Sequence, residues 1–233
     1  MTYAPMRVSL TRAAAFIAIA AMLAACSKKD STTAPTPGFT ITADASTNAQ
    51  IAPVGTAATK PIAVHVADQN GAVIPNAVVT WTVVSHAGTT TAATSMTDAT
   101  GTATMTWTLD TIARVDSMTA SIQGGATATV TATGTPGPAT QTAKFSGDAQ
   151  TVASGATSAP MIVKVKDRYG NGVSGVAVAW VVSGGGTLSA SSNLTDVTGQ
   201  AQVTLKLGSS PATYTIQATA AALTAVSFHL TGT

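Results

Sequence analysis

Residues 64–85 read VHVADQNGAVIPNAVVTWTVVS, and residues 163–184 read VKVKDRYGNGVSGVAVAWVVSG. The two stretches align without a gap, so that an Asp, a Gly, a Val and a Trp fall on their counterparts. Farther along the chain, residues 97–109 (TDATGTATMTWTL) align with residues 195–207 (TDVTGQAQVTLKL) after the loss of one residue. A period of slightly under one hundred residues predicts two copies of one folding unit.

Apolar and polar residues alternate within each copy, which is the pattern of β-strands with one buried face. Ile62, Val64 and Val66 point to one side of an extended chain, and the residues between them point to the other side. Further rows of the same kind are expected in the two cores: Met161, Val163, Val165; Ala77, Val79, Trp81, Val83; Val176, Val178, Trp180, Val182; Ala103, Met105, Trp107, Leu109; Ala201, Val203, Leu205, Leu207; Val130, Ala132; Phe228, Leu230. Because aliphatic residues share their face, the three Trp residues are expected in the core rather than at a binding surface.

The composition favours strands and tight turns over helices. There is no Glu, all nine acidic residues are Asp, and Thr and Val are abundant. Asn- and Gly-rich turn signals at residues 68–71 and 168–172 separate the alternating runs. About seven short strands per copy predict an all-β fold with two tandem antiparallel immunoglobulin-like β-sandwiches, at residues 39–135 and 140–233, after a signal peptide and a short linker.

Two features of each copy resemble the bacterial Ig-like domains of the invasin and intimin type. One is the strand pair around the Asp-x-x-Gly turn, which ends in Trp81 or Trp180, and the other is the TDxTGxA segment before the next strand. The resemblance covers both copies. It implies the same sandwich fold and a role in surface display, adhesion or protein–protein interaction, mostly as a stalk and occasionally as an adhesive tip.

The N-terminus has the organisation of an export signal. Arg7 and Arg12 precede the apolar run of residues 13–25, which ends in small residues. The run is too short to span a membrane comfortably, because a transmembrane helix needs about 20 apolar residues. We therefore predict a signal peptide at residues 1–25, in which either Met1 or Met6 is the initiator.

The single cysteine of the chain follows this run directly. Leu23-Ala24-Ala25-Cys26 resembles the lipobox of bacterial lipoproteins. The resemblance implies acylation of the Cys26 thiol, cleavage before Cys26 and insertion of the acyl chains into a membrane. Residues 26–38 are polar and Pro-rich and are expected to form a flexible tether. An exported lipoprotein, anchored at the outer membrane or cell surface, is the prediction, and an ordinary signal peptide with a chance Cys is the alternative.

The balance of charges and the lack of metal-binding and catalytic motifs exclude several classes of protein. After Cys26, cations and Asp residues balance, so we expect no nucleic-acid partner. The three His residues have no metal-ligand spacing, and no motif places a base beside a Ser. We therefore predict no catalytic residue, no cofactor and no metal. The expected role of the turn-associated carboxylates is to bond to the backbone of their own turns: Asp44, Asp68, Asp98, Asp110, Asp116, Asp148, Asp167 and Asp196.

Alternatives remain for the ligands of the chain. Asp68 with Asn70, or Asp98 and the equivalent turn at Asp196, are candidate Ca²⁺ ligands at the domain ends. The best candidate for contact with a protein or glycan partner is Tyr169 with the adjacent Arg168, because binding surfaces are rich in Tyr and Arg. The leading prediction is a non-enzymatic, lipid-anchored envelope protein for display or adhesion. A passive spacer and a carbohydrate-binding β-sandwich are the alternatives.

Overall fold

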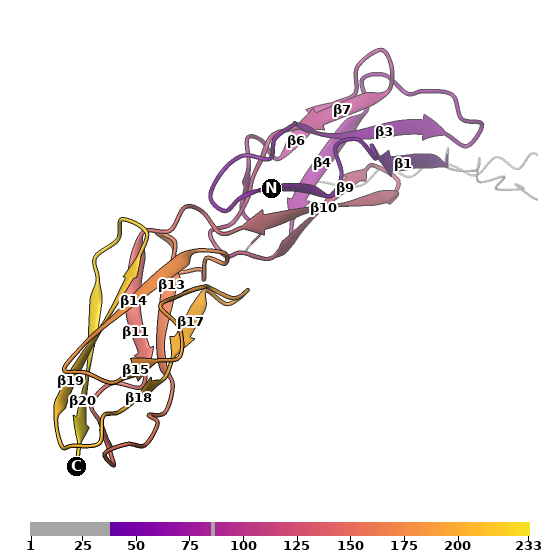
Figure 1. The fold of residues 1–233 in the computed structure, drawn as a ribbon. Helices are drawn as coiled ribbons and strands as arrows, with labels where there is room; N and C mark the ends of the chain where they lie inside the picture. Colours follow the sequence, from indigo (N-terminus) through magenta and orange to yellow (C-terminus); the bar gives the residue numbers. More distant parts are fainter. Residues whose placement is uncertain (1–37, 85–86) are drawn as a thin grey trace, which may run out of the picture. The chain divides into compact units, whose positions relative to one another are not determined.

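Every regular element in residues 38–84 and 87–233, which are the residues described by the computed structural model, is a β-strand (Figure 1). No helix in this part of the chain is long and apolar enough to cross a membrane. The predicted signal peptide, with Leu23, Ala24, Ala25 and Cys26, lies outside the described residues, as does most of the predicted tether.

The first sandwich consists of a three-stranded sheet in the order β1-β3-β7 and a five-stranded sheet in the order β2-β10-β9-β4-β6. A short pair, β5-β8, lies beside them. The strand bounds are β1 (Phe39–Ala43), β2 (Gln50–Pro53), β3 (Ile62–Asp68), β4 (Val78–Val83), β5 (Thr89–Thr90), β6 (Thr94–Met96), β7 (Thr102–Met105), β8 (Trp107–Thr108), β9 (Val115–Ile122) and β10 (Thr127–Thr135).

The second sandwich repeats this topology, with sheets in the orders β11-β13-β17 and β12-β20-β19-β14-β16 and the short pair β15-β18. The predicted fold class, two immunoglobulin-like β-sandwiches, is therefore confirmed. The strand bounds are β11 (Gln141–Ser146), β12 (Gln150–Val152), β13 (Met161–Lys166), β14 (Ala177–Ser183), β15 (Thr187–Leu188), β16 (Ser192–Leu194), β17 (Gln200–Val203), β18 (Leu205–Lys206), β19 (Thr213–Ala220) and β20 (Val226–Gly232).

The pairing is not wholly antiparallel, which corrects one part of the prediction. β2 runs parallel to β10, and β12 runs parallel to β20. In each sandwich the chain leaves the three-stranded sheet after its first strand and crosses to the five-stranded sheet, where it continues as a separate edge strand. The predicted row Ala103, Met105, Trp107 and Leu109 is also divided at Thr106, because β7 pairs with β3 whereas β8 pairs with β5.

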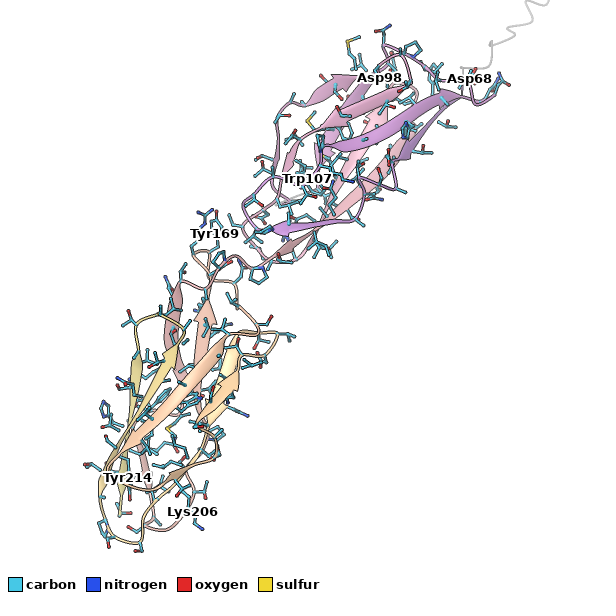
Figure 2. All side chains as sticks on the ribbon, turned by 45° about the horizontal axis from the view of Figure 1, so that its top comes forward. Asp68, Asp98, Trp107, Tyr169, Lys206 and Tyr214 are labelled. Carbon is cyan, nitrogen blue, oxygen red and sulfur yellow. The ribbon has the colours of Figure 1, made fainter. Side chains whose placement is uncertain are left out.

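The inward side chains of the strands fill the space between the two sheets of each sandwich. Trp107 is fully buried and lies inside the first sandwich (Figure 2), where its Nε1–H donates to the Ala87 carbonyl at 2.7 Å. Trp81 and Trp180 are 4% and 3% exposed. The centroid of the Trp180 ring lies 6.2 Å from that of Phe228, in the tilted arrangement that aromatic pairs favour. Other fully buried side chains that match the predicted rows are Ile62, Val64, Val79, Val130, Met161, Val163, Val165, Val178, Leu205 and Phe228.

The Thr of each TDxTG segment explains why this motif recurs. Thr195 is buried, and its hydroxyl donates to the Val173 carbonyl at 2.7 Å while it accepts the N–H of Val176 at 2.9 Å. The Thr97 hydroxyl makes the corresponding two bonds in the first sandwich. One side chain thus satisfies two backbone groups of the segment that leads into the Trp-bearing strand.

Candidate functional site

The Asp residues of the turns bind backbone groups. Asp98 and Asp68 lie at the same end of the first sandwich (Figure 2). Asp98 Oδ1 accepts the Thr100 hydroxyl at 2.6 Å and the N–H groups of Thr100 and Thr102 at 2.8 and 3.0 Å. Asp196 makes the equivalent bonds in the second sandwich. Each turn closes on a Gly with positive φ, of 74° at Gly101.

These bonds favour the ionised carboxylate and lower its pKa below the usual 3.8. The largest cause for Asp98 is the Thr100 hydroxyl, and for Asp196 it is the N–H of Gln200. The pKa of Asp68 is lowered chiefly by the N–H of Ala72. Among the described residues, no three His, Cys or Asp side chains are close enough together to hold a metal ion. The turn carboxylates act on their own backbone, in the way that Asx-turns do.

Asp116 lies beside the bend of residues 111–114, as predicted, and its Oδ2 accepts the Asp110 N–H at 3.3 Å, but it differs from the other Asp residues in its setting. It lies in β9, is 2% exposed, and its Oδ1 accepts Arg114 Nε–H at 2.9 Å. A second guanidinium nitrogen of Arg114 donates to Asp110 at 2.7 Å. A buried carboxylate needs such a partner, because its desolvation in isolation would be costly.

A second polar network on the first sandwich was not found from the sequence. His65 Nε2 lies 3.2 Å from Asp44 Oδ2, and His65 Nδ1 lies 3.0 Å from the Thr102 hydroxyl. The connectivity is that of an acid–base–nucleophile triad. However, the His65 side chain is 47% exposed, and the Thr102 N–H already donates to Asp98, so it cannot stabilise an oxyanion. The network therefore ties β3 to its neighbours instead of forming a catalytic site.

An apolar hollow of the first sandwich offers no reactive group. It has a volume of about 300 Å³, and it is lined by Phe39, Val66, Ile74, Pro75, Asn76, Ala77, Val78, Ile122 and Gln123. These side chains include two amides but no acid, base or nucleophile, so the hollow has no means of general acid–base or covalent catalysis.

The predicted partner-binding pair is ordered and exposed. The guanidinium carbon of Arg168 lies 4.4 Å from the centroid of the Tyr169 ring, which is a stacked cation–π arrangement. Tyr169 is 39% exposed (Figure 2), and its N–H donates to Asp167 Oδ1 at 2.9 Å. Burial raises the pKa of Asp167, but hydrogen bonds, first that from the Asn171 side chain, outweigh it and lower the pKa overall. The turn thus holds the pair at the surface.

Comparison with known proteins agrees with the fold. Residues 142–231 match the family described as "Bacterial Ig-like domain (group 1)". No curated protein matches the chain. Among solved structures, the D0-D1 domain of intimin is 22% identical, with a TM-score of 0.32 over 81% of this chain and 96% of that one.

Two other solved structures are also similar to the chain. InvD of Yersinia pseudotuberculosis is 20% identical, with a TM-score of 0.48, over 84% of this chain and 57% of that one. A glycosyl hydrolase family 2 member from Bacteroides cellulosilyticus is 18% identical, with a TM-score of 0.40, over 80% of this chain and 24% of that one. The family match lies in the second sandwich, and the first sandwich repeats its strand order.

Proposed function

We propose that this chain is a lipid-anchored, non-enzymatic protein of a bacterial cell envelope, which displays two Ig-like sandwiches for adhesion or protein–protein interaction. The observation that carries the proposal is the order of segments: a basic and apolar start, Leu23-Ala24-Ala25-Cys26, a polar tether and two sandwiches. Acyl chains on Cys26 supply the membrane affinity, because each buried CH₂ contributes about 0.8 kcal/mol and two chains suffice for stable anchoring.

The chemistry of the described residues supports a non-enzymatic role. The turn carboxylates are hydrogen-bonded to their own loops, and the apolar hollow of the first sandwich has no reactive lining. The matched family supports a structural or adhesive use of the second sandwich. Arg168 and Tyr169 are the proposed contact with a protein partner, because the stacked pair presents a guanidinium and a phenol at little entropic cost.

A passive spacer is the second candidate, and the outer surface of the first sandwich favours it. Apart from Val115, which lies opposite Thr133, the outward residues of β9 and β10 that pair across the two strands are Ser and Thr: Ser117, Thr119, Ser121, Thr127, Thr129, Thr131 and Thr133. Such a surface lacks the Tyr, Trp and Arg side chains in which binding sites are enriched.

The anchor is tested by fractionating cells that express the chain with a C-terminal tag, beside a Cys26→Ala variant. We expect wild type in the membrane fraction, labelled by fed radioactive palmitate, and the variant unlabelled in the soluble fraction. An unlabelled wild-type protein, or a variant that stays with the membrane, would contradict lipid anchoring.

Display is tested by treating intact cells with protease. Removal of the tag from intact cells supports adhesion at the surface. A tag that is cleaved only after the outer membrane is permeabilised contradicts surface display and favours the spacer.

A further inference from the structure

The outer face of the three-stranded sheet of the second sandwich carries an unusual set of side chains. Val163 and Val165 of β13 are fully buried, so the residues between and beside them face outward. Register places Gln200 beside Lys164 and Gln202 beside Ile162. The surface called here the β13 face consists of Phe145, Ile162, Lys164, Lys166, Gln200 and Gln202.

A break in the regular pairing places an aromatic ring on this face. The register of β11 against β13 shifts between Lys144 and Ser146, which leaves Phe145 without a partner on β13. Ser146 opposes the outward Ile162, and Lys144 opposes the buried Val163, so alternation from Lys144 turns Phe145 to the outer side of the sheet. Phe145 is consequently 58% exposed, although most aromatic residues of its size are buried.

The β13 face is also basic. Lys164 and Lys166 are two residues apart, so their Cα atoms are separated by about 6.6 Å. No ion pair of the described residues involves either ammonium group. The carboxylate that acts on Lys164 is Asp196, which is hydrogen-bonded within its own turn. Two adjacent ammonium groups on an open sheet face therefore remain available to an anionic ligand.

The two sandwiches differ in charge, which the balanced total of the chain conceals. The first contains Lys60 and Arg114 against five Asp residues and has a formal charge of −3, whereas the second contains four Lys and one Arg against three Asp and has a formal charge of +2. At the positions of Lys164 and Lys166, the first sandwich has His65, which is paired with Asp44, and Ala67. The β13 face is therefore a feature of the second sandwich.

We propose that the β13 face binds a linear polyuronate, a polysaccharide in which each sugar carries a carboxylate. The two ammonium groups pair with successive carboxylates, and the amides of Gln200 and Gln202 supply donors and acceptors for sugar hydroxyls. The exposed Phe145 ring packs against the C–H face of a sugar. The stretch from Ile162 to Lys166 spans about 13 Å along β13, which suits a short segment of an extended chain.

The geometry favours this ligand over other polyanions. A flat sheet face has no pocket for a single phosphate or nucleotide, and such ligands require a concave site. An acidic peptide would use the ammonium groups but would leave the ring and the amides without matched partners. The inference names a ligand class for the surface display proposed above and rests on it only for its biological setting, because binding is measured on purified protein.

The test measures binding of the purified full-length chain to immobilised polygalacturonate, with its methyl ester and polyglutamate as reference polymers. Wild type should bind polygalacturonate with an affinity that falls as salt rises, and at least about tenfold more tightly than either reference polymer. The variants Phe145→Ala and Lys164→Gln/Lys166→Gln should each weaken binding about tenfold. The control Lys60→Gln/Lys206→Gln removes the same charge from other exposed lysines and should bind as wild type does.

Three results would overturn the proposal: no binding of polygalacturonate by wild type, equal loss in the Lys60/Lys206 control, or binding of polyglutamate by wild type as tight as its binding of polygalacturonate. Unfolding midpoints of all variants are compared with wild type, so that a loss of binding is not a loss of fold. Because the assay needs no membrane, its failure leaves the anchoring and protease experiments unaffected. Failure of those experiments leaves the binding result equally unaffected.

Discussion

Replacing Thr195 with Val should destabilise the second sandwich, although the two side chains have nearly the same shape. Thr195 is 5% exposed, and its hydroxyl bonds to the Val173 carbonyl and to the Val176 N–H. Neither backbone group makes another hydrogen bond within the described residues. The substitution therefore leaves one donor and one acceptor without a partner in a half-buried region.

The magnitude follows from the two orphaned groups. Each buried polar group that loses its partner costs about 1–3 kcal/mol, and the added methyl group returns about 0.8 kcal/mol. Water can reach part of this region, so we expect a loss of about 2–4 kcal/mol in the free energy of unfolding of this sandwich. With a urea m-value of about 1–2 kcal/mol/M, the unfolding midpoint should fall by roughly 2 M.

The assay is a urea titration read by amide hydrogen exchange in β19, whose peptides report only on the second sandwich. Thr195→Ser is the matched control, because it keeps the hydroxyl and loses only the methyl group. We expect Ser to cost about 1 kcal/mol, less than Val. If Val proves as stable as wild type, or more stable than Ser, the hydroxyl does not hold this segment and the reasoning is refuted.

Further predictions concern the turns and the first core. Gly199→Ala should lower the free energy of unfolding by more than about 2 kcal/mol, because the residue has a φ of +79° and the new Cβ would lie 2.5 Å from a backbone oxygen. Gly155→Ala is the control, because Gly155 has a φ of +76° but open space around it. Calorimetry of the two variants should show the smaller loss for Gly155→Ala. Hydrogen bonds in their own turns lower the pKa of Asp98 and Asp196 below 3.8, so the stability that they contribute is present above that pH and is lost as the pH falls through the lowered values. An Asp98→Asn/Asp196→Asn variant should therefore show a flatter decline of melting temperature below about pH 4 than wild type, and an unchanged profile would contradict this assignment. Trp107→Ala should lower the free energy of unfolding by about 3–5 kcal/mol and lower the temperature of one calorimetric transition. Trp107→Phe should lose less stability, and equal losses would show that the ring does not fill the core.

Candidate sites were less predictable from the sequence than the fold was. The alternation of apolar and polar residues correctly predicted that His65 faces outward from its strand. Nothing in the sequence indicated that Asp44 and Thr102 flank the His65 ring. These residues are separated by 21 and 37 positions from His65 and meet only through strand register. The burial of Asp116 and its pairing with Arg114 could not be predicted for the same reason, since both depend on the packing of neighbouring strands.

The sequence by itself determined the repeat, the strand character and the inward rows of this protein. These depend on a local property, because successive side chains of any extended segment point to opposite sides. Tertiary structure alone decided which strands pair, including the parallel partners of β2 and β12, and which outward residues share a face. It also shifted the register of β11 against β13 at Phe145, next to the pair of Ser146 with Ile162, because a shift in register acts between strands and cannot be read from one of them alone.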